Sequence, residues 1–416
     1  MDSKVYYGEY SLRHWIDLIL SGNITLPEYQ RSFVWDEQDV KRLIKSLDDG
    51  QFVQPITIAH YNCDGEEKNL ILDGQQRLTS LLLAYLGYIP DKDKFDELDN
   101  ISSDDDSDEE VNKTKKYIGW TFEELLRFDI SNNNEKDYCT KIEETGNYTH
   151  LIIKLKNDRS VNDFLESTFL GFSYIIPETS NAEEVQEFFA RLFRNMNYLG
   201  SKLSPLESRR SLYYLNSKYK DYFEGITSDG KDVLCDIKIL ENMQSRKIDF
   251  VRYLSILSQY KLFHKEKKVL VGYSSYGSRE NYYGDYVAYI VGIDQEDRPE
   301  KFDGFNFEEL FPDNNLQLRF EILRNAINTL SSNLKLDPKT NAFTSWIDAD
   351  YWLFGLIYWI LFEGKSISIN TVLISSISKE IRVKRKDFTY SKGPNLLGNL
   401  RERLHSSIEI YKKYVE

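Results

Sequence analysis

The sequence predicts an α+β protein with a mixed α/β domain over residues 1–215 and a mainly α-helical domain over residues 216–416. Two observations support this prediction. Up to about residue 180, short alternating or continuous apolar segments, which are typical of β-strands, are interspersed with segments that carry apolar residues at helical spacing. From residue 204 onward the helical spacing prevails. A chain of 416 residues is long enough for two domains with separate cores.

The first 90 residues are predicted to form three helices and two strands. Ser11 is the expected N-cap of the first helix, which ends at Ser21-Gly22. Asp36 begins a second helix, and Gly50 stops it. The two strands and the third helix are predicted over residues 55–61, 69–73 and 75–86.

Further strands are predicted at residues 150–155 and 172–177, and an amphipathic helix follows at 183–197. Later helices are predicted over residues 204–223, 248–262, 317–332 and 348–362. The tyrosine-rich segment 271–293 is predicted to be irregular or to form a hairpin.

Charge is distributed unevenly along the chain. The net charge of -14 excludes a histone-like affinity of the whole protein for nucleic acid. Residues 91–110 contain eleven acids and two lysines, a net charge of -9, so we predict a mobile acidic insertion over about residues 91–114. Residues 379–413 contain ten Lys or Arg and four acids, a net charge of +6, which favours a local surface for DNA.

Composition also excludes several classes of protein. The three cysteines, Cys63, Cys139 and Cys235, are far apart and form no CxxC pair, which argues against a zinc site or a disulfide framework. The N-terminus lacks the features of a secretory signal, and the longest apolar stretch, residues 351–362, is too short to cross a bilayer. We therefore expect a cytoplasmic protein without a membrane partner.

The most informative motif is Asp73-Gly74-Gln75-Gln76-Arg77, which lies between a predicted strand and a predicted helix. A helix N-terminus presents N–H groups and a partial positive charge, which suit a phosphate group. Glycine permits close approach of an anion, and arginine can donate two parallel hydrogen bonds to it. A structural alternative exists, because Asp73 and Gln76 also have the spacing of a capping box, and spacing alone favours this alternative.

Two further clusters accompany this motif. Tyr29-Gln30-Arg31 lies in an extended segment before the second helix, where the arginine can reach the same anion, and the nearby Trp35 is expected in the core. The third cluster consists of Asn197, Gly200, Ser204, Pro205, Glu207 and Arg209. Its serine and glutamate also have capping-box spacing, with proline at the first helical position.

The segments ITLPEYQRSFVWDEQDVKRLIKSL, LILDGQQRLTSLL and FRNMNYLGSKLSPLESRRSLYYL contain these clusters in order. This order resembles the domain of unknown function of GmrSD-type type IV restriction enzymes, a relative of ParB-like nucleotide-binding and nuclease domains. The resemblance covers about residues 10–215 and is interrupted by the acidic stretch. In one departure, Asn195 occupies a position where the family often has arginine, although Arg194 is adjacent.

In that family the DGQQR domain binds and hydrolyses nucleoside triphosphate and helps to recognise modified or foreign DNA. The resemblance therefore implies a nucleotide-dependent enzyme of prokaryotic antiviral defence, with Mg²⁺ or another divalent cation as cofactor. The implied nucleotide-binding residues are Tyr29, Gln30, Arg31, Gly74, Gln75, Asn197 and Arg209. The implied catalytic residues are Asp73 (also the metal ligand), Gln76, Arg77 and Glu207. The basic residues expected to contact DNA are Arg191, Arg194, Arg210, Lys384, Arg385 and Lys386.

Two alternatives stay open, a nucleotide-gated DNA-binding module without significant catalysis and a nuclease that uses the DGQQR site directly. The usual partner of the family is an HNH nuclease domain, which needs clustered histidines for a metal. The histidines here, which have no ligand spacing, are His14, His60, His150, His264 and His405. We therefore expect no HNH domain in the C-terminal half and consider a separately encoded nuclease or defence partner, as well as homo-oligomers.

Overall fold

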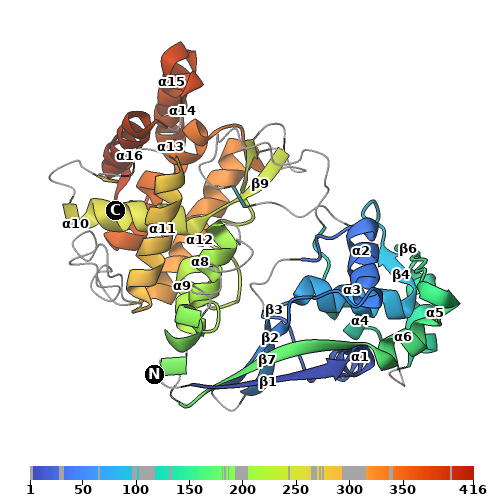
Figure 1. The fold of residues 1–416 in the computed structure, drawn as a ribbon. Helices are drawn as coiled ribbons and strands as arrows, with labels where there is room; N and C mark the ends of the chain where they lie inside the picture. The colour runs from blue at the N-terminus through green and yellow to red at the C-terminus, as the bar shows by residue number, and fades with distance from the viewer. Residues whose placement is uncertain are drawn as a thin grey trace. The chain divides into compact units, whose positions relative to one another are not determined.

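The protein forms two compact units, one of residues 1–98 and 110–193 and the other of residues 99–109 and 194–416 (Figure 1). The computed structural model describes residues 3–27, 32–63, 66–95, 101–102, 118–130, 134–179, 181, 184–185, 187–192, 205–241, 244–263, 269–270, 273, 276–292, 315–336, 341–393 and 396–416. The predicted α+β class is confirmed, with a sheet and helices in the first unit and mainly helices in the second. The domain boundary at residue 215 stays a prediction, and the third sequence cluster falls in the second unit.

The first unit contains the elements that the N-terminal sequence predicts, together with several shorter ones. Its elements are β1 (Ser3–Ser11), α1 (Leu12–Leu20), α2 (Glu37–Asp48), β2 (Ile56–Cys63), β3 (Glu66–Asp73), α3 (Gln75–Leu86), β4 (Tyr88–Pro90), α4 (Glu123–Leu126), α5 (Glu135–Thr145), β6 (Tyr148–His150), the 3-10 turn η1 (Lys156–Asp158), α6 (Val161–Ser167) and β7 (Phe169–Pro177). The predicted caps are confirmed, since Ser11 accepts a hydrogen bond from the His14 amide and Asp36 forms a capping box with Asp39.

The main sheet of this unit has the strand order β1-β7-β2-β3. β1 pairs antiparallel with β7, β7 pairs parallel with β2, and β2 pairs antiparallel with β3. One face of the sheet packs against α1 and α3. Trp15 of α1 is fully buried there, donates a hydrogen bond to the Leu170 carbonyl at 3.2 Å and contacts the Phe172 ring edge-on. We call this face the helix-covered face.

One strand prediction for the first unit is wrong, and one strand was not predicted. The strand predicted at 150–155 ends at His150, because its partner strand β4 is short. The next residue, Leu151, donates a hydrogen bond to the carbonyl of Gly87. Gly87 is the C-cap of α3. The sequence reading also missed β1, whose side chains from Ser3 to Glu9 are exposed on both faces. Such a strand has no apolar alternation to reveal it.

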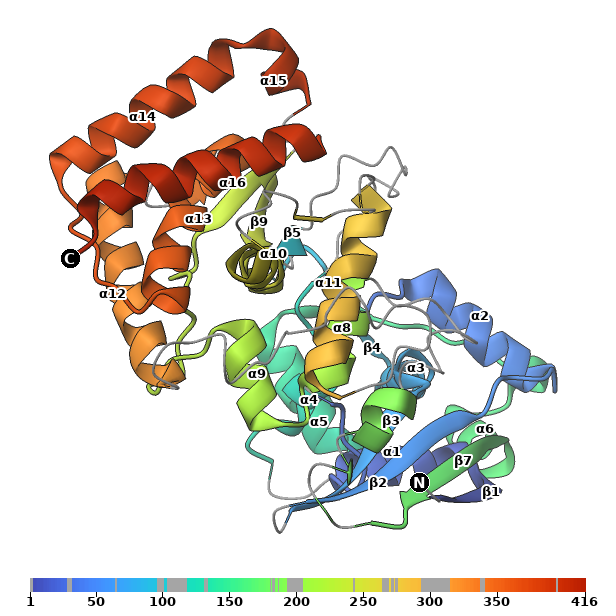
Figure 2. The same ribbon diagram turned by 90° about the vertical axis from the view of Figure 1, so that its left-hand side faces the viewer.

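The second unit is mainly helical, and Figure 2 shows its helices from the side. Its elements are β5 (Ile101–Ser102), α8 (Pro205–Tyr213), α9 (Ser217–Glu224), β8 (Lys238–Glu241), β9 (Gln244–Ile248), α10 (Phe250–Phe263), α11 (Tyr276–Ile290), α12 (Leu316–Leu334), β10 (Ala342–Phe343), α13 (Trp346–Ile357), the π-helical turn η4 (Tyr358–Phe362), α14 (Thr371–Lys386), α15 (Phe388–Lys392), α16 (Leu397–Tyr411) and the 3-10 turn η5 (Lys412–Tyr414).

Two predictions for the second unit differ from the structure. The tyrosine-rich segment 271–293 contains α11, and the prediction of irregular structure or a hairpin is wrong. Tyr282, Tyr283 and Tyr286 are fully buried on this helix, so tertiary packing outweighs the weak helix propensity of Tyr and Gly. The helix predicted at 204–223 is divided between α8 and α9, because the Asn216 side chain caps the second helix.

Most of the predicted acidic insertion, residues 96–100 and 103–114, lies outside the described residues. Ile101 and Ser102 within it form β5, which pairs in parallel with β9 of the second unit. The sheet to which it belongs has the order β10-β8-β9-β5. This part of the insertion therefore contributes an edge strand to the helical unit.

Asp350 lies at the centre of the helical unit and is fully buried. It accepts hydrogen bonds from Arg252 at 2.6 and 3.0 Å, from Arg403 at 2.9 Å and from the Tyr253 hydroxyl at 3.1 Å. These partners come from α10 and α16, so one carboxylate on α13 joins three helices. Burial acts to lower the pKa of Arg403, but the charge of Asp350 outweighs it and raises that pKa.

α13 and α16 cross at close range because Gly355 has no side chain. A Cβ atom at this position would overlap Tyr411 and the Ser407 carbonyl. The Ser407 hydroxyl donates to the Tyr351 carbonyl and accepts from the Gly355 amide, both at 2.8 Å. The hydroxyl thus bridges a backbone carbonyl and a backbone amide of α13, shortly before the helix widens into η4.

We predict that Asp350→Ala lowers the free energy of unfolding by about 3–5 kcal/mol, because it leaves two buried arginines without their common partner. Glu124→Ala is the matched control. Glu124 pairs with Arg127 at 2.7 Å on the surface, and its loss is expected to cost at most about 0.5 kcal/mol. Urea unfolding of both variants tests the difference, and equal stabilities would contradict the central role of Asp350.

A second prediction concerns Asp232, whose carboxylate accepts a hydrogen bond from the Leu234 amide at 2.6 Å. Burial raises the pKa of Asp232 to about 6, above its usual value of 3.8. The folded protein therefore holds this proton more tightly than the unfolded chain, and stability falls as the pH rises from about 4 to 6. Asp232→Asn keeps the acceptor and should raise the unfolding free energy by roughly 1–3 kcal/mol at pH 7 but not at pH 3.5. Thermal unfolding across this range measures the effect, and a gain that does not vary with pH would contradict it.

Candidate functional site

The DGQQR motif forms the turn between β3 and α3. Asp73 is the last residue of β3, and Gly74 is the N-cap of α3 with φ of 99°. A Cβ atom on Gly74 would overlap the Ile56 side chain and would lie 3.2 Å from Arg77 Nη2. Both the left-handed backbone and this crowding require glycine here. The chain can thus turn from strand to helix with the arginine folded back over the turn.

The capping-box interpretation of this motif is wrong. No side chain caps α3 at Gly74. The Asp73 carboxylate instead accepts a hydrogen bond from Arg77 Nη2 at 2.8 Å. Gln76 points to another segment of the chain. The spacing that suggested a cap therefore serves two separate interactions.

Gln76 is buried and uses both ends of its carboxamide on one backbone segment. Its Oε1 accepts from the Val34 amide at 3.0 Å, and its Nε2 donates to the Ser32 carbonyl at 3.1 Å. Residues 32–34 directly follow Tyr29-Gln30-Arg31. The same segment is held from its other side, since the Phe33 amide donates to the Trp120 carbonyl at 2.8 Å and the Phe33 side chain is buried. Gln76 therefore positions the backbone that leads out of the second motif.

Arg77 is only 15% exposed, and its partner Asp73 is 37% exposed. A second bond joins Arg77 Nη2 to the Pro55 carbonyl at 3.3 Å. Its Nε is buried and has no hydrogen-bond partner among the described residues. Since an arginine carries five N–H donors, the site retains donor capacity beside the N-terminus of α3.

The second motif, Tyr29-Gln30-Arg31, lies outside the described residues. Trp35 follows it, is partly buried and packs against the core of the first unit, as expected. Of the third cluster, Asn197, Gly200 and Ser204 also lie outside the described residues. Pro205 begins α8, which is the position predicted for it.

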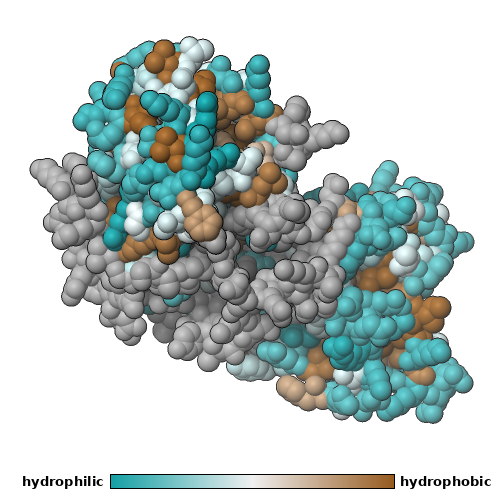
Figure 3. Space-filling view, turned by 90° about the horizontal axis from the view of Figure 1, so that it is seen from above, coloured by the Kyte–Doolittle hydropathy of each residue, from teal (hydrophilic) through white to brown (hydrophobic). Residues whose placement is uncertain are grey.

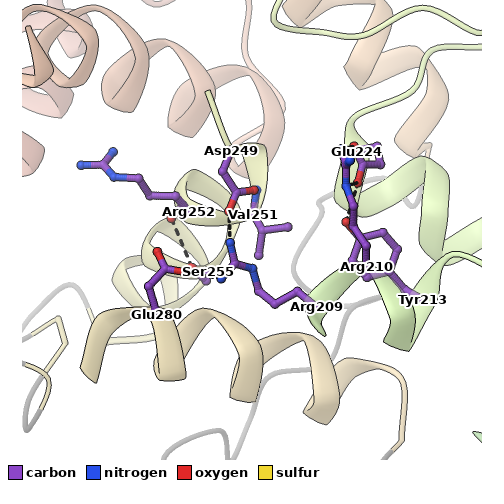
Figure 4. A network of polar contacts seen from close by, with 9 residues as sticks. All are labelled: Arg209, Arg210, Tyr213, Glu224, Asp249, Val251, Arg252, Ser255 and Glu280. Atoms are coloured by element: carbon purple, nitrogen blue, oxygen red, sulfur yellow. Dashed lines mark hydrogen bonds and ion pairs between the residues drawn. The ribbon is translucent and has the colours of Figure 1, made fainter. Parts of the chain in front are cut away.

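Arg209 of α8 lies in the interior of the second unit, as Figure 4 shows. It donates to Asp249 at 2.5 Å and to Glu280 of α11, and both carboxylates are buried. Burial acts to lower the pKa of Arg209, but these two carboxylates outweigh it and raise that pKa. The predicted nucleotide-binding arginine thus makes an internal ion pair, which joins α8 to the start of α10 and to α11. Glu207, the predicted catalytic residue, is half-buried on the same helix.

Arg210 also forms an ion pair within the second unit. It donates to both carboxylate oxygens of Glu224 at 2.8 and 2.7 Å, and the Tyr213 hydroxyl donates to the same carboxylate at 2.5 Å (Figure 4). The fork geometry of this pair links α8 to α9. Arg210 is therefore already neutralised by a partly buried partner.

The other residues expected to contact DNA differ in how they are paired. Arg191 pairs with Glu187 one helical turn away, and Arg194 lies outside the described residues. Lys384 pairs with Glu402 at 2.8 Å, and Arg385 donates to Asp348 and Thr344. Lys386 is exposed.

The sequence reading missed two exposed basic residues of α14, Lys379 and Arg382. Their spacing relative to Lys386 places all three on one helix face, and this was a signal that the sequence already contained.

Within the described residues, no group of three or more His, Cys, Asp or Glu side chains is arranged to hold a metal ion. Cys139 and Cys235 are free thiols. None of the helices described has the length and apolar character that crossing a membrane requires.

Comparison with known proteins agrees with this arrangement of motifs. An uncharacterized protein of Methanocaldococcus jannaschii, MJ0686, is 28% identical over 265 residues. The match covers 49% of this chain and 42% of the relative, so the chain spans less than half the length of that protein. Residues 12–214 match the model of the N-terminal domain of the GmrSD restriction endonuclease. The N-terminal part of the chain is thus similar to the N-terminal domain of this restriction endonuclease.

Proposed function

We propose that this protein is a nucleotide-dependent component of a prokaryotic restriction or antiviral defence system that acts on foreign or modified DNA. The similarity of residues 12–214 to the N-terminal domain of the GmrSD restriction endonuclease supports the role in restriction. The observation that carries the nucleotide assignment is the turn at Gly74, where a helix without a side-chain cap begins beside a partly buried arginine.

The phosphates of the nucleotide are proposed to bind at the N-terminus of α3. The helix dipole favours an anion there, and the left-handed backbone of Gly74 lets Arg77 lie close to the start of the helix. Arg77 supplies charge-assisted hydrogen bonds, with Nε as one donor that no described residue uses. Gln30 and Arg31, which lie outside the described residues, are proposed to bind the same anion.

A divalent cation is proposed to arrive with the triphosphate. Mg²⁺ keeps several waters and is usually held by one or two carboxylates together with substrate phosphates. Asp73 fits this pattern because its side chain is 37% exposed. The ion pair with Arg77 is formed by one of its two carboxylate oxygens. When bound, the cation would neutralise phosphate charge and orient the terminal phosphate for attack by water.

The residues of the turn have distinct proposed roles. Asp73 holds the cation and orients Arg77, and Arg77 stabilises the charge that develops on the phosphates. Gln76 is proposed to hold the neighbouring backbone in position, because both ends of its carboxamide already bind backbone groups. The catalytic role of Glu207, which belongs to the second unit, stays a prediction.

Two other functions fit the same site, a nucleotide-gated DNA-binding module and a nuclease acting at the DGQQR turn. Incubation of the purified protein with each triphosphate and Mg²⁺, with and without DNA, distinguishes the three. Phosphate release supports hydrolysis, retention of DNA only with nucleotide supports gating, and strand breaks support a nuclease.

We predict that Arg77→Ala preserves the fold but abolishes triphosphate binding and turnover. Loss of its charge-assisted bonds should weaken binding by roughly 1.5–3 kcal/mol per bond. Arg77→Lys should not restore function, because an ammonium group cannot make the two parallel bonds of a guanidinium. Titration calorimetry and phosphate release measure both effects.

Arg127→Ala is the matched control for this variant. Arg127 also pairs with a nearby acid in the first unit, Glu124, but on the surface and away from the turn. It should bind and hydrolyse nucleotide normally. A folded Arg77→Ala protein with normal triphosphate binding would rule out the nucleotide site at this turn.

DNA is proposed to contact the exposed face of α14. Lys379, Arg382 and Lys386 are exposed there, and Val372 and Val383 are 62% and 54% exposed beside them. Seen from above, the surface of the helical unit shows hydrophobic patches among hydrophilic side chains (Figure 3). Lys384 and Arg385 are less suited to a test, because their reversal would place acids opposite Glu402 and Asp348.

Reversal of Lys379, Arg382 and Lys386 to Glu should therefore weaken DNA binding and reduce its salt dependence by about one unit of slope per lost phosphate contact. The control reverses the same amount of charge at Lys45, Lys136 and Lys154, which are exposed on the first unit. Filter binding at several salt concentrations compares the two. Equal losses in both variants would show that only net charge matters, and no loss in either would place the DNA site elsewhere.

A further inference from the structure

The strand register of the first unit places four residues in one row across the main sheet, one from each strand. Tyr7 of β1 lies opposite Ser173 of β7, Ser173 lies beside Thr57 of β2, and Thr57 lies opposite Asp73 of β3. Residues paired across neighbouring strands point to the same face of a sheet. The row therefore ends at the Asp73–Arg77 pair and lies on the face opposite the helix-covered face.

The side chains of this row are accessible and mostly polar. Tyr7 is 80% exposed, while Ser173 and Thr57 are half-buried. The Ser173 hydroxyl donates to the Thr57 hydroxyl at 3.2 Å, which fixes the two side chains beside each other. The row thus continues the proposed phosphate site as a strip of hydroxyl groups that ends in an exposed aromatic ring.

The surroundings limit the row on both sides. On the same face, the next row toward the far end of the sheet contains the buried residues Ile175, Ala59 and Leu70 and, on β1, Val5, which is 42% exposed. Farther along this face, Tyr61 contacts Phe189 of the helical segment 187–192. On the other side, the neighbouring row contains the exposed Glu9 of β1 and Gly171 of β7, where a Cβ atom would lie 3.6 Å from Pro55, whose carbonyl binds Arg77. The row from Tyr7 to Asp73 is therefore the hydroxyl-bearing part of this face that leads to the DGQQR turn.

We infer that this row binds the nucleoside part of the nucleotide, with the base stacked on Tyr7, the sugar over Thr57 and Ser173, and the phosphates at Arg77. The inference rests on the proposed nucleotide function. Neighbouring strands are about 4.8 Å apart, so the three steps from β3 to β1 span about 14 Å. This matches an extended nucleotide lying across the strands. An exposed aromatic ring can stack any base, and paired hydroxyls suit sugar hydroxyl groups.

The test compares nucleoside triphosphates with inorganic tripolyphosphate, which has no base or sugar. Calorimetry with Mg²⁺ measures the affinity of the wild-type protein and of Tyr7→Ala for ATP, GTP, CTP, UTP and tripolyphosphate. In Tyr7→Ala the nucleotides should bind about tenfold more weakly or worse, whereas tripolyphosphate binding should not change. Tyr7→Phe keeps the ring and should bind as the wild type does.

Tyr6→Ala is the matched control, because Tyr6 is the neighbouring residue on the same strand, is 52% exposed and points to the opposite face. It should bind nucleotides normally, whereas Thr57→Val should weaken nucleotide but not tripolyphosphate binding. Unchanged nucleotide affinity in Tyr7→Ala, or an equal loss in Tyr6→Ala, would overturn the inference and leave the phosphate site intact. A wild-type protein that binds neither nucleotides nor tripolyphosphate would overturn the inference together with the proposed function.

Discussion

The candidate site depends on one backbone constraint, the left-handed conformation of Gly74 between β3 and α3. An L-residue with a side chain would be strained there and would overlap Ile56. Because the chain turns at this residue, Asp73 and Arg77 lie on the same side of the turn and form their ion pair. The same turn leaves the beginning of α3 without a side-chain hydrogen bond from its N-cap residue.

Gln76 extends the effect of this turn to a distant part of the chain. Its two backbone hydrogen bonds reach Ser32 and Val34, more than 40 residues earlier in the sequence. A buried carboxamide with both ends satisfied resists movement, because breaking either bond would leave a buried polar group without a partner. Two of the motifs are therefore linked in the structure, because Gln76 of the DGQQR motif holds the backbone next to the YQR segment.

The arginines of the protein fall into two physical classes. Arg209, Arg252 and Arg403 are buried with carboxylates from other helices and hold the second unit together. Such pairs give position and specificity more than net stability, since desolvation offsets much of the attraction. Arg77 differs because it is partly accessible and lies at a helix N-terminus. Burial and pairing, not residue type, separate a structural arginine from a candidate ligand-binding one.

The sequence by itself determined the local elements whose signals are local. Caps such as Ser11 and Asp36, the apolar stripe of α3 and the strands before it follow from spacing within one turn or one strand. Tertiary structure decided what depends on distant partners. The tyrosine-rich segment forms α11 because its rings are buried. Arg209 is internal because it pairs with Asp249 and Glu280. Gln76 binds the backbone of residues 32–34 and does not form the expected cap. The row from Tyr7 to Asp73 depends on strand register, which arises from pairing between segments up to 170 residues apart and is not visible in any local pattern.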